Sequence, residues 1–397
     1  MTTEILAPPA TSVDPVAWLR KNLFSSVLSS LMTLLMGALL MWLAINVGQW
    51  ALSEARWDVV SRNLRLFLIG QYPVDQAWRL WASLLLLSVL SGVSAGAFGH
   101  TIRVLAVAVS AVQALLEAVM AVSPVGPLIT VGMLANAAVV WAGMVVGYRQ
   151  IVPRRALVIA WLVSIPVMYL LISGIGSAPL PEVSSNLWGG LLLTILLAVV
   201  GILLSFPLGV LLALGRRSSL PAIRFVSTAY IEIIRGVPLV TILFMADIML
   251  PFFLPGEVRI DRVIRAMGGI TLFSAAYVAE NVRGGLQAIP SGQIEAAQAL
   301  GLHSWQTNLF IVLPQALRSV IPANVGLFIS LLKDTTLVAI IGLSELLGIG
   351  QSILAQPASL GAHLEVFAFV GVIFFVLCYA MSQASYRLER ALGVGTR

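Results

Sequence analysis

The chain has 397 residues, of which 59% are hydrophobic and only 10% are charged, and its mean hydropathy is +0.99. A soluble domain usually carries about a quarter charged residues, so this composition excludes an entirely soluble protein and predicts an all-α polytopic membrane protein, whose helices satisfy their own backbone hydrogen bonds in lipid. The single Cys378 and three widely separated histidines predict no disulfide framework and no metal site. The net charge of +6 is attributed to arginines in cytoplasmic loops rather than to a nucleic-acid partner.

The first 24 residues are predicted to form a cytoplasmic tail. They contain Glu4 and Asp14 and are rich in proline, whereas a secretory signal has a basic start and a short apolar core. We therefore expect the first long apolar run to be retained as a membrane span.

About ten membrane spans are predicted from the apolar runs. They cover approximately residues 25–48, 80–99, 103–123, 128–147, 156–174, 188–214, 237–254, 266–286, 320–344 and 365–386. An even number of spans places both termini on one side of the membrane. Arg20 and Lys21 precede the first span and Arg387 and Arg390 follow the last, so that side is expected to be the cytoplasm.

Two arginine-containing segments lie on the predicted outer side and oppose this orientation. The first, Ser53–Arg79, also contains Trp57, Leu64 and Phe67 and is interpreted as an amphipathic piece lying at the membrane interface. The second, Arg259–Arg265, has no such explanation in the sequence.

The chain is predicted to divide at Ser173–Asn186, a loop rich in glycine, proline and serine. Before it, residues 25–176 contain the first five spans, in which Gly92 and Gly96 are four residues apart and would let two helices approach closely. Glu117, one turn from Gln113, either marks a transport path or, in the commoner case, is a carboxyl group capped within the bundle.

Residues 290–318 form the polar segment between two later spans, and they predict a short helix–turn–helix on the cytoplasmic side. Pro290 precedes a helix that has Glu295 in an early turn, Ala296 and Ala297 keep that helix thin, and Gly301 ends it. A second amphipathic helix, from Trp305 to Val312, is expected to run into Leu313 and Pro314.

This segment resembles the EAA loop of the permease subunits of bacterial ABC importers. The resemblance is carried by Glu295-Ala296-Ala297, Gly301 and Leu313-Pro314, and it extends through TAYIEIIRGVPLVTILF, AYVAENVRGGLQAIPSGQIEAAQALG, VLPQALRSVIP and KDTTLVAIIG. The chain is most similar to the larger permease subunits of the polar, broad-specificity L-amino-acid branch, which carry extra N-terminal spans. The resemblance implies a five-span type I importer core in residues 185–390, whose EAA loop docks in a groove of a separate ATPase.

The resemblance also implies partners for this chain. They are an ABC ATP-binding subunit, a second, related permease subunit in a heterodimer, and a periplasmic amino-acid-binding protein, all at the bacterial inner membrane. A phosphate-binding loop needs Gly-Lys-Ser/Thr, but Lys21 and Lys333 follow Arg20 and Leu332. ATP and magnesium are therefore expected on the partner ATPase, and this chain is expected to be a transport subunit without an ATPase site.

Several polar residues within the predicted spans are candidates for the substrate pathway or for gating. Glu280 either pairs with Arg283 three residues on or faces a cavity, where it would attract an ammonium group. Lys333, Asp334 and Thr335 either pair mutually at a helix break or bind the charged groups of an amino acid. The remaining candidates are Asp247, a lone carboxylate where the family tends to have an uncharged residue, and Arg235, Gly236 and Pro238, which form either a gate or a membrane anchor.

Two other classes of protein are weighed against the importer. An ion-coupled secondary transporter of small polar solutes could use carboxylates such as Asp247, Glu280 and Asp334, but it has no need of a docking loop. A membrane-embedded enzyme requires convergent catalytic or metal-binding groups, and the separated histidines do not provide them.

Overall fold

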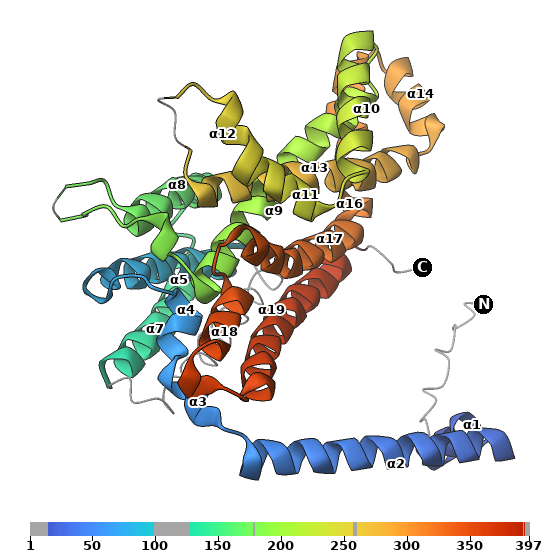
Figure 1. Cartoon of the computed structure of the whole chain (residues 1–397). Coiled ribbons are helices and arrows are strands. Elements are labelled where there is room, and N and C mark those ends of the chain that lie inside the picture. The colour runs from blue at the N-terminus through green and yellow to red at the C-terminus, as the bar shows by residue number, and fades with distance from the viewer. Residues whose placement is uncertain (1–14, 99–126, 178, 257–259, 392, 394–397) are drawn as a thin grey trace. The chain divides into compact units, whose positions relative to one another are not determined.

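The computed structural model describes residues 15–98, 127–177, 179–256, 260–391 and 393 (Figure 1). All the extended secondary structure in these ranges is helical. The chain forms two compact units, Met1–Arg56 and Trp57–Arg397. Each unit is described by itself.

The first unit contains one long apolar helix. A short helix, α1 (Pro15–Asn22), precedes α2 (Val27–Gln49), which continues as a π-helix over Trp50–Glu54. Ser26 starts α2 with a reciprocal cap, because its hydroxyl accepts the Ser29 N–H while the Ser29 side chain accepts the Ser26 N–H. No residue of α2 is buried, so its apolar side chains are free to face lipid.

The second unit contains the remaining helices. They are α3 (Trp57–Arg62), α4 (Leu64–Ile69), α5 (Trp78–Phe98), α7 (Pro127–Tyr148), α8 (Arg154–Ser173), α9 (Gly190–Arg216), α10 (Pro221–Arg235), α11 (Leu239–Phe244), α12 (Leu250–Phe253), α13 (Arg262–Gln287), α14 (Ser291–Ala299), α15 (Ser304–Gln306), α16 (Leu313–Ser319), α17 (Ile321–Asp334), α18 (Leu346–Leu354) and α19 (His363–Ala391). Short π-helices or 3-10 helices connect several of them.

The predicted spans largely coincide with these helices. Within the described residues, six helices are long and apolar enough to cross a membrane, and a seventh span is possible if one bent pair counts as a single crossing. The predicted spans 128–147 and 266–286 coincide with α7 and α13, which are not among those six, and 103–123 lies outside the described residues. The count of ten spans therefore stays a prediction.

The bent pair lies where one span was predicted over 237–254. That region consists of α11, a π-helix (Met245–Met249) and α12, and its axis makes an angle of 108° with α10. The bend falls between Arg235 and Leu239, where Pro238 has no N–H to continue the helix.

The position of the segment Ser53–Arg79 at a membrane interface stays a prediction, and the structure shows that part of its apolar surface is covered by protein. Leu64 and Phe67 are buried, α4 packs on α9 and α18, and the ring of Phe67 lies 4.9 Å from that of Phe369 in α19. The hydroxyl of Tyr72 donates to the carbonyl oxygen of Ile172 at 2.9 Å. Arg79 is fully buried and donates to the carbonyl oxygen of Pro181 at 2.8 Å. From Trp57 to Arg79 the segment is therefore part of the second unit, and its buried apolar residues pack against other helices of that unit.

Two helices of the second unit pack with their backbones in contact through glycine, as the spacing of Gly92 and Gly96 predicted. A Cβ atom on Gly92 would lie 2.3 Å from the Val140 carbonyl oxygen, and one on Gly96 would lie 2.2 Å from the Met144 carbonyl oxygen. On the facing helix α7, a Cβ on Gly147 would lie 2.1 Å from the Val93 carbonyl oxygen. Each of these contacts involves backbone, which cannot move aside as a flexible side chain can.

Replacing Gly147 by alanine is therefore expected to separate α5 from α7 and to destabilise the protein by about 1–3 kcal/mol. At Gly371, in the middle of α19, an added Cβ would meet no atom within 4 Å, so the same substitution there is expected to change stability by less than about 0.5 kcal/mol. Unfolding of the two purified variants by SDS in mixed micelles measures this difference. Equal stabilities would contradict the close packing.

The pairing of α9 with α13 forms the centre of the unit. Leu193, Leu197 and Ile270 are fully buried there. At Gly209 the helices come so close that an added Cβ would lie 2.5 Å from the side chain of Val278. This pair runs from the predicted outer side, near Gly190 and Arg262, to the predicted cytoplasmic side, near Arg216 and Gln287.

Candidate functional site

The predicted coupling loop begins with the helix α14, which starts directly after Pro290. Its end forms a Schellman motif. The N–H of Leu302 donates to the carbonyl oxygen of Ala297 at 3.1 Å, and the N–H of Gly301 donates to that of Gln298 at 2.9 Å. Gly301 has φ +79°, a conformation that other residues rarely adopt. The expected end of the helix at Gly301 is confirmed.

The second half of the loop is one helical run with a change of winding. It passes from α15 through a π-helix, Thr307–Val312, into α16. The second helix was expected to span Trp305 to Val312 and to run into Pro314, and the helical run does reach Pro314 but continues past it, because Pro314 lies in the first turn of α16. Proline lacks the N–H that an α-helix would use at this position, and a π-helix just before it is one way to accommodate that loss.

The loop presents one buried alanine and an exposed surface. Ala297 is 1% exposed and anchors α14, which packs against the π-helix, whereas Glu295 and Ala296 are exposed. Three large apolar side chains are also exposed, and we call them the apolar patch. They are Leu300, Trp305 and Phe310, at 82%, 61% and 63% exposure. The rings of Trp305 and Phe310 lie 6.2 Å apart between their centroids, and exposed apolar groups that lie together on a polar loop are typical of a surface that another protein covers.

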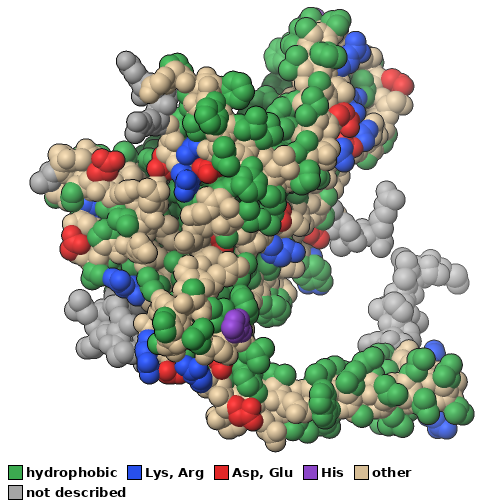
Figure 2. All heavy atoms as spheres, in the orientation of Figure 1, with side chains coloured by type: hydrophobic (Ala, Val, Ile, Leu, Met, Phe, Trp, Pro, Cys, Tyr) green, Lys and Arg blue, Asp and Glu red, His purple; other side chains and the backbone are tan. Residues whose placement is uncertain are grey.

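The carboxylate of Glu280 joins the ends of three helices in an ionic cluster. It accepts from Arg283 on α13 and lies 3.3 Å from Arg235 on α10 and 3.6 Å from Arg216 on α9. Arg216 also pairs with Glu232 at 2.9 Å. The pairing of Glu280 with Arg283 is confirmed. The alternative, in which Glu280 faces a cavity and attracts an ammonium group, is not supported, because the carboxylate is already paired with arginines. α14 lies at the same end of the unit as α10 (Figure 1), and charged side chains gather there (Figure 2).

Arg235, Gly236 and Pro238 lie at the 108° bend between α10 and α11. Arg235 belongs to the ionic cluster, and its guanidinium lies 5.6 Å from the centre of the Tyr277 ring. Gly236 caps α10 with a right-handed φ of −80°, so the bend does not depend on the conformational freedom of glycine. Their role as a gate stays a prediction.

Lys333, Asp334 and Thr335 lie at a break in the helix, as expected. The α-helix α17 ends at Asp334, and a 3-10 helix, Thr335–Ile341, continues it. The expected mutual ion pair is absent, since no salt bridge joins Lys333 to Asp334 among the described residues, and consecutive residues on a helix do not face each other. Thr335 is fully buried and donates its hydroxyl proton to the Leu332 carbonyl oxygen at 2.7 Å.

Asp247 is not a lone carboxylate, and the prediction that it stands alone is wrong. It lies in the π-helix after α11, and its side chain is 9% exposed. Its Oδ1 atom is 3.2 Å from Nε of Arg262 and 3.3 Å from Nη2 of Arg265. This pairing explains why these two arginines occur on the predicted outer side, where topology alone disfavours them.

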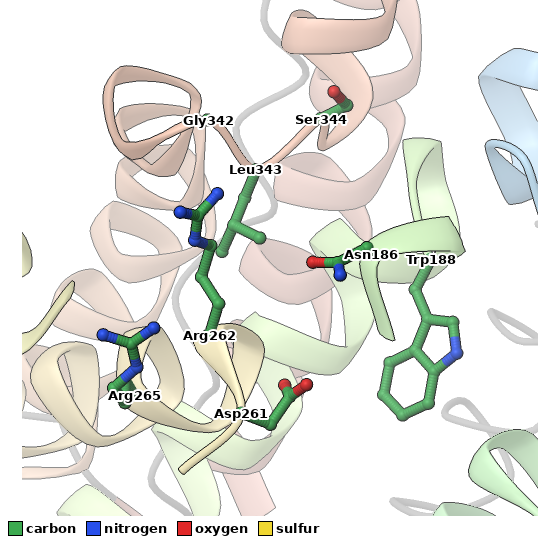
Figure 3. A pocket seen from close by; sticks show the side chains of 8 residues that line it. All are labelled: Asn186, Trp188, Asp261, Arg262, Arg265, Gly342, Leu343 and Ser344. Atoms are coloured by element: carbon green, nitrogen blue, oxygen red, sulfur yellow. The ribbon is translucent and has the colours of Figure 1, made fainter. Parts of the chain in front are cut away.

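A pocket of about 550 Å³ opens beside these arginines, and sequence reasoning did not find it (Figure 3). Its walls come from the segment before α9, the first turn of α13 and the segment before α18. The lining residues are Asn186, Trp188, Asp261, Arg262, Arg265, Gly342, Leu343 and Ser344. The only signal in the sequence was the disagreement of Arg259–Arg265 with the predicted topology. We call this cavity the outer pocket.

Hydrogen bonds hold the walls of the outer pocket together. Asp261 caps α13 by accepting the N–H of Val263 at 2.8 Å, and it also accepts the hydroxyl proton of Ser185. The N–H of Gly190 donates to the carbonyl oxygen of Ser344 at 2.9 Å. Next to it, the buried Glu345 caps α18 by accepting from the N–H groups of Leu347 and Gly348. The pocket is therefore framed by fixed backbone.

Comparison with known proteins gives matches over part or all of the chain. Residues 205–394 match the family model of the binding-protein-dependent transport system inner membrane component. An inner membrane amino-acid ABC transporter permease protein of Escherichia coli K12, YhdY, is 37% identical over 100% of this chain and 99% of its own length. The glutamate/glutamine/aspartate/asparagine transport system permease protein BztC of Rhodobacter capsulatus is 38% identical over 98% of this chain and 97% of its own length. A shorter protein of Bacillus subtilis, the probable glutamine ABC transporter permease GlnP, is 37% identical over 51% of this chain and 92% of its own length.

Proposed function

Because the chain belongs to the inner membrane permeases of binding-protein-dependent transport systems, and within them to the amino-acid ABC transporter permeases, we propose that it forms half of the translocation pathway of an ATP-driven amino-acid importer. The observation that carries this proposal is similarity over the full length to YhdY at 37% identity. The chain is a multi-pass inner membrane protein of this family, and both termini are proposed to be cytoplasmic.

The proposed division of labour within the chain follows the lengths of its relatives. GlnP corresponds to about half of this chain, which supports residues 185–390 as the permease domain and residues 25–176 as accessory helices. Within the permease domain, residues 290–318 are proposed to dock on the ATPase through Glu295, Ala296, Ala297, Gly301, Leu313 and Pro314. The exposed face of α14 and the apolar patch support this assignment.

The proposed partners complete the importer. A separate ABC ATP-binding subunit binds ATP and magnesium, a second permease subunit supplies the other half of the pathway, and a periplasmic binding protein delivers the amino acid. ATP binding closes the ATPase dimer, the coupling loops move with it, and the helices shift between inward-open and outward-open states. The substrates named for BztC suggest glutamate, glutamine, aspartate and asparagine as the first amino acids to test.

Two measurements test this function. Tagged full-length protein, purified from its native membrane in mild detergent, is expected to bring an ATP-binding subunit and a second permease subunit, both identifiable by mass spectrometry. Proteoliposomes containing that complex are expected to take up one or more of the four amino acids only when ATP is enclosed and the binding protein is outside. Recovery of the chain alone, with uptake that uncouplers abolish and ATP depletion does not, would identify an ion-coupled secondary transporter instead.

A further inference from the structure

We propose that the outer pocket binds the α-carboxylate of a free amino acid at the extracytoplasmic mouth of the pathway, and that Arg262 is the residue that binds it. The identity of the solute rests on the proposed function, whereas the site itself rests on the geometry of the pocket. Of the candidates that the sequence predicted within the spans, Asp247 pairs with the arginines of this site, whereas Glu280, Lys333, Asp334 and Thr335 do not line it.

The position of the pocket suits an early step of transport. Its three walls lie at the ends of helices opposite to the coupling loop, because α13 begins at Arg262 and leads to α14, while α9 begins at Gly190 and leads to Arg216. A solute approaching from the side opposite to the coupling loop therefore meets this pocket before it reaches the middle of the bundle.

The guanidinium of Arg262 provides an unoccupied pair of donors. Its Nε atom is used by Asp247, but among the described residues no acceptor bonds to its two terminal nitrogens. The side chain is 44% exposed and extends into the pocket toward Gly342, where an added Cβ would lie 3.5 Å from Nη1 (Figure 3). Two parallel N–H groups on a planar fork match the two oxygens of a carboxylate.

Other donors line the same cavity. The Nε atom of Arg265 is buried and has no hydrogen-bond partner among the described residues. The side chains of Asn186 and Ser344 are exposed, and Asn186 points toward Arg262 and Leu343 (Figure 3). Asp261 also lines the cavity, and its two oxygens accept from Ser185 and from the N–H of Val263. Asp247 and Asp261 together balance the charges of the two arginines, so the feature that favours a carboxylate is the free fork of Arg262 and not an excess of positive charge.

The size of the cavity favours a whole small solute. A volume of about 550 Å³ falls within the range of roughly 300–1,000 Å³ that is typical of small-molecule sites. The remaining walls include Leu343 and backbone at Gly342, which leave room for a side chain beyond the carboxylate. The alternative source of a carboxylate is an acidic side chain of the docked binding protein, and the experiment separates the two.

The test uses a thiol at the pocket in the complete importer. Ser344→Cys is introduced with Cys378→Ala, and the purified complex is placed in lipid nanodiscs without ATP. The rates of modification by an anionic methanethiosulfonate (ethylsulfonate) and by a cationic one (trimethylammonium) are then compared. We expect the anionic reagent to be favoured, and Arg262→Gln to lower the anionic-to-cationic rate ratio about threefold to tenfold. Arg262→Lys should keep most of the ratio, because it keeps the charge.

Protection by ligands then identifies what the pocket binds. L-glutamine and L-glutamate at millimolar concentration are expected to slow the labelling of Cys at 344 without any binding protein, whereas L-glutamine α-amide, which lacks the α-carboxylate, is not. Protection should be lost in Arg262→Gln and in Arg262→Lys, since lysine lacks the fork. A cysteine at Val74, which is 65% exposed and does not line the pocket, is the control and should show neither effect.

Each other outcome counts against the proposal. A thiol that does not react, an unchanged rate ratio in Arg262→Gln, or equal protection by the amide would overturn carboxylate binding. Protection that requires the binding protein would assign the pocket to a docking contact instead. The same preparation with ATP and binding protein reports uptake independently, so an importer that transports amino acids normally but shows no protection refutes the pocket while the proposed function stands.

Discussion

Replacing Glu295 by lysine is expected to abolish ATP-driven uptake while the protein still inserts and folds. Glu295 is exposed on α14, and no ion pair holds it among the described residues, so the substitution should change the free energy of unfolding by less than about 0.5 kcal/mol. A reversed charge in a protein contact costs several kcal/mol. We expect a loss of about 3 kcal/mol in ATPase binding, which is more than a hundredfold in affinity.

Co-purification of the ATP-binding subunit and uptake into proteoliposomes measure the two parts of this expectation. Glu182→Lys, the same charge reversal at an exposed residue between α8 and α9, is the matched control and should retain both. Gly301→Asp should reproduce the defect, because a side chain at φ +79° strains the Schellman motif that ends α14. Normal uptake by Glu295→Lys would show that the coupling loop has been wrongly assigned.

Replacing Glu280 by glutamine is expected to destabilise the permease domain by about 1–3 kcal/mol and to remove most of its uptake. The carboxylate is the common partner of Arg216, Arg235 and Arg283, and its side chain is only 22% exposed. Glutamine of nearly the same size leaves Arg235 and Arg283 close together without their anion and Arg216 with Glu232 alone, and breaking a partly buried ion pair from one side is costly. The ends of α9, α10 and α13 should separate.

Glu232 provides the matched control for this prediction. It belongs to the same cluster, but its side chain is 55% exposed, and within the part of the chain that the structure describes its one salt bridge is to Arg216. Glu232→Gln should therefore cost less than about 1 kcal/mol. SDS unfolding in mixed micelles compares the two variants, and their uptake is compared at equal protein content. If both variants lose the same stability, Glu280 does not hold the helix ends together.

The features that the sequence predicted correctly depend on residues close together in the chain. Pro290 and Gly301 bound α14 through local backbone properties, because proline fixes its own φ and glycine adopts the positive φ that ends the helix. Gly92 and Gly96 mark a close helix contact because their spacing matches one helical turn. The pairing of Glu280 with Arg283 was predictable for the same reason, since they are three residues apart.

The features that were missed depend on contacts between distant parts of the chain. Nothing periodic connects Asp247 to Arg262 and Arg265 across a loop, so the sequence pattern does not reveal that this carboxylate is paired. The segment Ser53–Arg79 has the amphipathic pattern of an interfacial helix, and only its packing on α9, α18 and α19 shows that protein covers it. The nine-residue helix α18 is too short for a span, so the sequence pattern does not distinguish it from a loop. The segment just before α18 forms one wall of the outer pocket, and the pocket is therefore not visible in the sequence either.

The apolar patch on the coupling loop also bears on how the importer is made. A newly synthesised copy of this chain, before it meets its partners, presents Leu300, Trp305 and Phe310 to water, and such a surface is what chaperones retain and quality-control proteases degrade. Under the proposed function, the ATPase subunit covers it. The amount of this permease that a cell can keep is then set by the supply of ATPase, so that unbalanced synthesis of the two leads to turnover of the unassembled permease.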